Sequence, residues 1–203
     1  MRVALVLLVS FAVGAVPFSY LVAHSVAGTD LREVDSGTVS GTALYKVAGF
    51  LPLAVGGVLD VVKGIPGPLL AGGGVLAAFA AMAAVAGHNW SPYIGGAGGR
   101  GISPALGSFL VIAWPGTVLL LAGLTLGRLV RHTGLGTFIT LLVLPFFLAA
   151  LGYADGALAA GLIMVPMFLK RVLGNGPLPR PNRPRAAAHR LLFDNDAPTP
   201  ADT

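Results

Sequence analysis

The sequence has no cysteine and few charged residues, and each shortage excludes a class of protein. Without thiols, the chain has no disulfide framework, no catalytic cysteine and no thiolate ligands for zinc or iron–sulfur clusters. Only 10% of the 203 residues are charged, whereas an ordinary soluble domain has roughly 25%. Because 55% of the residues are hydrophobic, we expect a membrane protein and not a water-soluble globule.

Three long stretches of the chain lack Asp, Glu, Lys and Arg, namely residues 3–29, 64–99 and 101–127. A helix that crosses a bilayer needs about 20 apolar residues, which these stretches supply. The fold class is therefore predicted to be an all-α polytopic membrane bundle. About seven transmembrane helices are expected, at residues 3–25, 47–62, 66–86, 102–115, 116–130, 134–153 and 156–171. Six spans stay open as an alternative, since the run 102–130 must be split at Trp114-Pro115-Gly116.

The basic residues favour the seven-span arrangement and give its orientation. In that arrangement, only Arg2 and Lys63 of the 13 Lys and Arg residues fall on one side. The other eleven fall in alternate loops or in the C-terminal tail: Arg32, Lys46, Arg100, Arg128, Arg131, Lys170, Arg171, Arg180, Arg183, Arg185 and Arg190. Since cytoplasmic loops are enriched in Lys and Arg, the N-terminus is predicted outside and the C-terminus in the cytoplasm. This orientation explains the net charge of +5 without a nucleic-acid partner.

The two ends of the chain complete the prediction of domains. Residues 1–173 are expected to form the integral membrane domain, and residues 174–203 a Pro- and Arg-rich cytoplasmic tail that is disordered. The first apolar segment has a second interpretation, as a secretory signal cleaved after Ser25-Val26-Ala27. Its apolar stretch is longer than the usual length of about 7 to 15 residues, and only Arg2 precedes it, so a retained first span is favoured.

Two polar loops on the predicted cytoplasmic side form the candidate site. The first, residues 28–42 with Lys46 close behind, combines hydroxyl groups, charges and glycines. The second, residues 87–101, ends in Gly98-Gly99-Arg100-Gly101. Consecutive glycines let backbone N–H groups converge on one point, and the helix expected from residue 102 adds its positive N-terminal dipole. With Arg100 as a bidentate partner, the second loop resembles a phosphate cradle.

Each of these features also has a simpler structural interpretation. The glycine loop can be a flexible connection with one orienting arginine, and His88 an interfacial histidine at the end of a helix. Trp90 and Tyr93 can belong to an interfacial aromatic belt. Asp30 and Arg32 can form a solvated surface pair.

Taken in order, the residues of both loops and of the helices beside them resemble the bacterial membrane family of acyl-phosphate:glycerol-3-phosphate acyltransferases. The resemblance covers residues 14–107. The positions that carry it are Gly14, Pro17, Tyr20, Leu21, Gly28, Asp30, Leu31, Arg32, Ser36, Gly37, Thr42, Gly49, Asp60, Lys63, Gly64, Pro66, Gly87, His88, Gly98, Gly99, Gly101 and Gly107. The family's seven-span topology, with active loops facing the cytoplasm, agrees with the topology obtained from charge.

The departures from the family pattern lie mainly in the same loops. Thr38 and Ala43 stand where the family has Asn, Lys46 stands where it has Arg, and Arg100 stands where it has Lys. A third family motif is only faintly visible between residues 185 and 196, with Ala187 in its Asn position.

The resemblance implies transfer of a fatty acyl group from acyl phosphate to the 1-hydroxyl of glycerol 3-phosphate, giving lysophosphatidic acid at the cytoplasmic face of the bacterial cell membrane. It implies no nucleotide, metal or other cofactor, and membrane lipid as the surroundings. We expect the protein to be a monomer. The implied phosphate-binding residues are Arg32, Lys46, Gly98, Gly99, Arg100 and Gly101. The implied catalytic residues, which orient the hydroxyl or the oxyanion, are Ser36, His88 and Thr38. Two other functions stay open: a catalytically lapsed or substrate-shifted binding protein, and a small anion transporter.

Overall fold

The structure is a computed structural model that describes residues 1–35, 37–174 and 183–194. The described residues form α-helices and two short 3₁₀ helices, with no strand among them, which confirms the all-α prediction. The α-helices are α1 (Arg2–Ala15), α2 (Phe18–Ala27), α3 (Gly41–Ala48), α4 (Phe50–Val62), α5 (Pro66–Ala71), α6 (Gly74–Asn89), α7 (Ile102–Ile112), α8 (Trp114–Leu129), α9 (Thr133–Ala150), α10 (Ala154–Leu173) and α11 (Arg183–Phe193). The 3₁₀ helices are η1 (Leu31–Glu33) and η2 (Pro92–Ile94).

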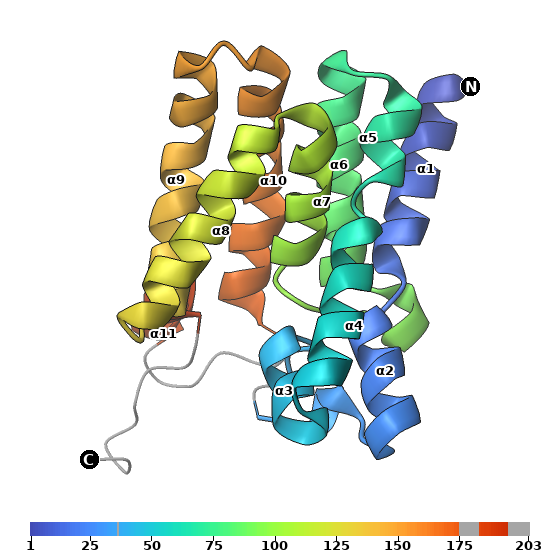
Figure 1. The fold of residues 1–203 in the computed structure, drawn as a ribbon, viewed down its shortest axis with the longest axis vertical. Helices are drawn as coiled ribbons and strands as arrows, with labels where there is room; N and C mark the ends of the chain where they lie inside the picture. The colour runs from blue at the N-terminus through green and yellow to red at the C-terminus, as the bar shows by residue number, and fades with distance from the viewer. Residues whose placement is uncertain (36, 175–182, 195–203) are drawn as a thin grey trace.

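The helices are long and apolar enough for a membrane protein, as the composition predicts. Four helical segments among the described residues have the length and hydropathy to cross a bilayer: Arg2–Ala27, Phe50–Ala71, Thr133–Ala150 and Ala154–Leu173. Two further apolar helices, α7 and α8, are shorter. Most helices lie side by side along the long axis of the molecule (Figure 1).

The structure corrects the boundary between the second and third predicted spans. Residues 66–71 do not begin a new span, because α5 continues the direction of α4 and the two form one apolar segment, Phe50–Ala71. Pro66 is compatible with this continuation, since proline is tolerated in the first turn of a helix. The chain reverses at Gly72 and Gly73 instead, where φ angles of 76° and 105° exclude most other residues. Lys63, expected in a loop, is therefore inside the bundle, with 3% of its surface exposed.

The first predicted span, residues 3–25, is broken at Pro17 into α1 and α2. Because α1 stops before Pro17, the last carbonyl groups of α1 have no partners in a following helical turn. Side chains from elsewhere bind two of them: the Oγ of Ser91 donates to the oxygen of Ala15 at 2.6 Å, and the Nζ of Lys63 donates to the oxygen of Val16 at 2.7 Å. The break thus joins α1 to the second loop and to the α4–α5 segment.

The alanine-rich helix α6 lies at the centre of the bundle, between α1 and α10. A Cβ on Gly14 of α1 would overlap the backbone of Ala84, and one on Gly87 of α6 would overlap the carbonyl of Phe11. Small residues at these contacts allow the backbones to approach closely, as is common between membrane helices. The main apolar core lies on the other side of α6 and is shared by α7, α8, α9 and α10.

Both candidate loops lie at the same end of the bundle (Figure 1). That end carries α3, the connection from α6 to α7, the turn between α8 and α9, and α11. The opposite end carries the N-terminus, the turn between α5 and α6 and the turn between α9 and α10.

The C-terminal region, most of which is expected to be a mobile tail, contains a helix among its described residues. Within it, α11 is helical and packs against α9 and α10. The expectation for residues 175–182 and 195–203 concerns positions outside the described part of the chain. The sequence signal for α11 is weak because its exposed arginines and short apolar face resemble a polar linker.

Candidate active site

The two predicted loops contact each other directly at the end of the bundle that carries α3 and α11. The N–H of Val39 donates to the carbonyl oxygen of Gly98 at 3.2 Å. In a second contact, a guanidinium nitrogen of Arg32 lies 3.5 Å from the carbonyl oxygen of Ile94. Thr38, which precedes Val39, is buried at this junction with 8% of its surface exposed. The structure therefore brings Thr38 and Arg32 to the second loop, as a shared site requires.

The glycines of the second loop pack against the end of α6. The N–H of Gly99 donates to the carbonyl oxygen of His88 at 3.2 Å. A Cβ on Gly99 would overlap the Nε2 of His88, and one on Gly98 would overlap the carbonyl oxygens of His88 and Asn89. These glycines are needed for close packing, and the imidazole of His88 faces the loop. Gly101, at a φ of 81°, occupies the N-cap of α7, so the loop leads into a helix N-terminus.

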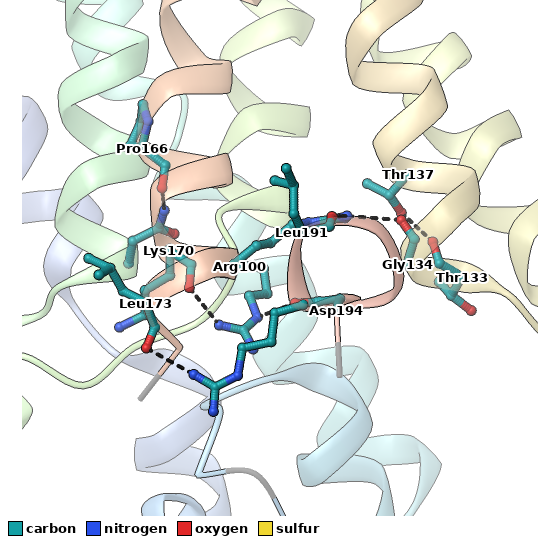
Figure 2. Close-up of polar contacts among 12 residues, drawn as sticks. Arg100, Thr133, Gly134, Thr137, Pro166, Lys170, Leu173, Leu191 and Asp194 are labelled. Carbon is teal, nitrogen blue, oxygen red and sulfur yellow. Dashed lines mark hydrogen bonds and ion pairs between the residues drawn. The ribbon is translucent and has the colours of Figure 1, made fainter. Parts of the chain in front are cut away.

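Arg100 is held by two contacts on its guanidinium group (Figure 2). Its Nε lies 2.6 Å from the Oδ1 of Asp194, directly after α11, and its Nη1 donates to the carbonyl oxygen of Lys170 at 3.0 Å. Burial raises the pKa of the Asp194 carboxyl, and the positive charges of Arg100 and Arg171 oppose that rise. The guanidinium is largely buried and already bound to an anionic group, as a phosphate-binding arginine would be in a complex.

A buried polar cluster lies behind the second loop, between α2, α4 and α6. Asp60 accepts a hydrogen bond from the Oγ of Ser19 at 2.5 Å and lies 2.7 Å from the Nζ of Lys63. The Nδ1 of His88 is 4.0 Å from the Oδ1 of the same carboxylate. His88 is thus placed between Asp60 and Gly99, one ring nitrogen toward each. Charged groups this deep in a membrane protein are costly unless they are paired, and they commonly mark functional sites.

The two basic residues predicted in the first loop are paired with nearby carboxylates. Arg32 contacts Asp30, with its Nη2 2.6 Å from one carboxylate oxygen. This contact holds the pKa of Asp30 below its usual value. Lys46 pairs with Asp35 at 2.8 Å, and about half of each side chain is exposed. Arg32 and Asp30 therefore form the surface ion pair that was the simpler interpretation of these residues. Arg32 also reaches the carbonyl oxygen of Ile94 in the second loop.

The structure gathers some predicted site residues more closely than others. His88, Thr38, Gly98, Gly99, Gly101 and Arg100 belong to the contacts around the second loop. Lys46 lies on α3, away from these contacts, in its exposed pair. Ser36 lies outside the described residues.

Sequence reasoning missed several residues that the structure places beside the candidate loops. Asp60 and Lys63 are among the positions that carry the family resemblance. No catalytic or binding role was predicted for them, because they were expected near the end of a span. Lys170 and Asp194 were assigned only to the tail and to its charge. A usable signal for Lys170 is its place in the last turn of a long apolar helix. No sequence signal links Asp194 to Arg100, which is 94 positions earlier.

Among the described residues, no group of three or more His, Asp or Glu side chains is placed to hold a metal ion.

The comparisons with known proteins decide the family. Residues 4–174 match the family model described as glycerol-3-phosphate acyltransferase. The chain belongs to the glycerol-3-phosphate acyltransferase family. Its relatives include the glycerol-3-phosphate acyltransferase 2 of Moorella thermoacetica, 35% identical over 70% of this chain and 75% of the relative. A second relative, the glycerol-3-phosphate acyltransferase of a Synechococcus species, is 31% identical over 84% of this chain and 88% of the relative.

Solved structures show the same fold for this acyltransferase. The chain resembles the crystal structure of PlsY, an integral membrane glycerol 3-phosphate acyltransferase, in its glycerol 3-phosphate form. The TM-score is 0.77 at 23% identity, with 98% of this chain and 96% of the other covered. The lysophosphatidic acid form of the same protein gives a TM-score of 0.75 at 21% identity, covering 94% of each chain. The family recognised from the two loops is confirmed, and so is the prediction of an integral membrane acyltransferase.

Proposed function

We propose that this acyltransferase moves a fatty acyl group from acyl phosphate to the 1-hydroxyl of glycerol 3-phosphate. The proposed active site is the end of the bundle that carries α3, the glycine loop and α11. The observation that carries the proposal is how the glycine loop is held. Its glycines pack against His88, and the guanidinium of its Arg100 is bound by Asp194 and by the carbonyl oxygen of Lys170. Two solved forms of one relative support the acceptor and the product, because one is a glycerol 3-phosphate form and the other a lysophosphatidic acid form. The donor follows from the family resemblance of the loops.

The proposed reaction makes modest demands on the protein. The 1-hydroxyl oxygen attacks the acyl carbon, the bond from that carbon to the phosphate oxygen breaks, and inorganic phosphate leaves with the electron pair. The hydroxyl proton leaves to water, and an ester bond remains. Because acyl phosphate is a mixed anhydride with a good leaving group, the main tasks are to bind two phosphates and to align the hydroxyl.

Each task has candidate residues at the junction of the loops. Arg100 would exchange Asp194 for a substrate phosphate, assisted by Gly101 at the N-terminus of α7. His88 faces the loop and would orient the hydroxyl or the oxyanion, together with Thr38 and Ser36. Arg32 and Lys46 would provide further contacts to anions once they leave Asp30 and Asp35.

We also propose a topology of seven membrane crossings in the bacterial cell membrane, with the active end in the cytoplasm. The chain alternates between the two ends of the bundle, and the basic loops share one end (Figure 1). Placing Lys63 inside the bundle strengthens the charge argument, since Arg2 alone then remains as a basic residue at the opposite end.

The test is acyl transfer by purified, detergent-solubilised protein with palmitoyl phosphate and labelled glycerol 3-phosphate. Arg100→Ala should lower kcat/KM by about 10- to 100-fold, as expected for loss of a charge-assisted hydrogen bond. Arg128→Ala is the matched control, because Arg128 is exposed at the same end of the bundle. A palmitoyl thioester in place of palmitoyl phosphate tests the donor.

The result also separates the proposal from the binding-protein and transporter alternatives. Product formation that falls in Arg100→Ala and persists in Arg128→Ala supports the enzyme. Glycerol 3-phosphate binding without any product from folded protein would contradict the proposed reaction and favour a binding protein. Uptake of the anion into vesicles would favour a transporter.

A further inference from the structure

Lys170 is a buried cation without a counter-ion beside the glycine loop. Only 1% of its surface is exposed. Among residues 1–35, 37–174 and 183–194, no carboxylate lies within ion-pair distance of its Nζ, and no acceptor receives a hydrogen bond from it. Within the described residues, its Nζ lies over the ring of Trp90, 5.5 Å from the ring centroid. Trp90 belongs to the second loop, so the ammonium group points toward the candidate site.

The charged side chains near Lys170 do not neutralise its ammonium group. The guanidinium of Arg100 is bound to the backbone oxygen of Lys170 itself, and its charge opposes that of the ammonium group. Asp194, directly after α11, pairs with Arg100. The charge of Asp194 is therefore shared by Arg100 and Arg171, and this carboxylate does not pair with Lys170. Figure 2 shows Asp194 beside Arg100.

The other buried basic residues show how a structural cation is held in this fold. Lys63 is equally buried but lies 2.7 Å from Asp60 and donates to the oxygen of Val16. Arg171, the neighbour of Lys170, has no ion pair among the described residues, but its Nη1 donates to the carbonyl oxygens of Gly134 and Leu191 and so links α10 to α9 and α11. Its Nε and Nη2 are buried without a hydrogen-bond partner. Lys170 makes no such contact in the described structure. A cation over an aromatic ring gains far less than it loses by leaving water.

We propose that Lys170 binds a phosphate group of a substrate, together with Arg100 and the glycine loop. This inference rests on the proposed function and adds a phosphate-binding residue to it. A phosphate monoester supplies the missing negative charge and accepts hydrogen bonds from an ammonium group. Lys170 is therefore kept unpaired for the ligand, at a cost to the stability of the unliganded protein.

The experiment compares Lys170→Met with the parent, with Lys170→Arg and with two controls. Lys63→Met removes an equally buried lysine that has a counter-ion, and Arg128→Met removes an exposed charge at the same end. Binding of inorganic phosphate is measured by titration calorimetry and by the shift of the unfolding temperature in detergent. Steady-state kinetics then give the KM for palmitoyl phosphate and for glycerol 3-phosphate separately.

Lys170→Met should unfold at the same temperature as the unliganded parent or higher, while Lys63→Met unfolds at a lower temperature. Lys170→Met should also bind inorganic phosphate at least about tenfold more weakly, whereas Lys170→Arg stays within about threefold of the parent and Arg128→Met is unchanged. The substrate whose KM rises identifies the phosphate that Lys170 contacts, and a rise for either one supports the proposal.

Two results overturn the inference without touching the proposed function. One is unchanged phosphate affinity and unchanged KM values in Lys170→Met while the parent transfers the acyl group. The other is failure of Lys170→Met to fold while Lys170→Arg folds, because the charge is then structural. A folded parent that makes no product instead contradicts the proposed function.

Discussion

At the scale of single residues, Asp60 shows how charge is accommodated inside the bundle. Its two carboxylate oxygens are shared between Ser19 and Lys63, with His88 nearby. Neither Asp60 nor Lys63 exposes more than 3% of its surface. Each charge is therefore tolerable only in the presence of the other, because an isolated charge in such a place is strongly unfavourable.

Asp60→Asn should lower the free energy of unfolding by about 3 to 5 kcal/mol, since it leaves the Lys63 ammonium group buried without a counter-ion. The double variant Asp60→Leu/Lys63→Met should recover a large part of that loss, because it removes both charges. Chemical unfolding in detergent measures both. Equal stabilities for the single and the double variant would show that Lys63 does not depend on Asp60.

Residue types in the loops allowed the prediction of the candidate site, but not of its buried support. His88 and Arg100 were recognisable because histidine and charged residues are rare in this apolar chain, and because consecutive glycines flank Arg100. The pairing of Arg100 with Asp194 could not be predicted, since a distant helix brings the carboxylate to it. Lys63 was misplaced because a lysine between apolar runs ordinarily marks a loop, although its i,i+3 spacing from Asp60 is compatible with an ion pair on one helix.

At the scale of elements, glycines set the distance between α7 and the α4–α5 segment. A Cβ on Gly107 would overlap the carbonyl oxygen of Val61, and one on Gly64 would overlap the carbonyl oxygen of Pro104. This close contact holds α7, whose N-terminus receives the glycine loop, against the segment that carries Asp60. Packing far from the loops therefore contributes to the geometry of the candidate site.

Gly107→Ala should lower the free energy of unfolding by about 1 to 3 kcal/mol, the usual cost of an overpacked contact. It should also lower kcat/KM for acyl transfer, because α7 must move. Gly57→Ala is the matched control: Gly57 is also inside a helix, but its added Cβ would meet open space, so about 0.5 to 1 kcal/mol of stabilisation is expected. Thermal unfolding and activity of both variants check this. Equal effects at the two positions would contradict the packing argument.

The elements themselves were largely predictable, with one instructive exception. Apolar runs correctly predicted helices close to the observed α7, α8, α9 and α10. The error at residues 62–74 arose because Pro66 resembles a helix break, although proline in a first turn does not prevent the chain from continuing. The chain turns at Gly72 and Gly73 instead. In the sequence these glycines are equally compatible with a flexible point inside a span, and only their positive φ angles in the structure identify the turn.

At the scale of the whole molecule, the distribution of charge predicts which end faces the cytoplasm. The absence of cysteine makes this prediction easy to test, because a single introduced cysteine has no background. Val130 and Leu151 follow the ends of α8 and α9, at opposite ends of the bundle, and both are exposed. Val130→Cys and Leu151→Cys therefore form a matched pair of labelling sites.

If the basic end is cytoplasmic, a membrane-impermeant maleimide added to intact bacterial cells should label Leu151→Cys and leave Val130→Cys unmodified. Disruption of the membrane should then expose Val130→Cys to the reagent. The physical reason is that Lys and Arg are retained on the cytoplasmic side during insertion, while only Arg2 is basic at the other end. The reverse labelling pattern would contradict the predicted orientation and place the candidate site outside the cell.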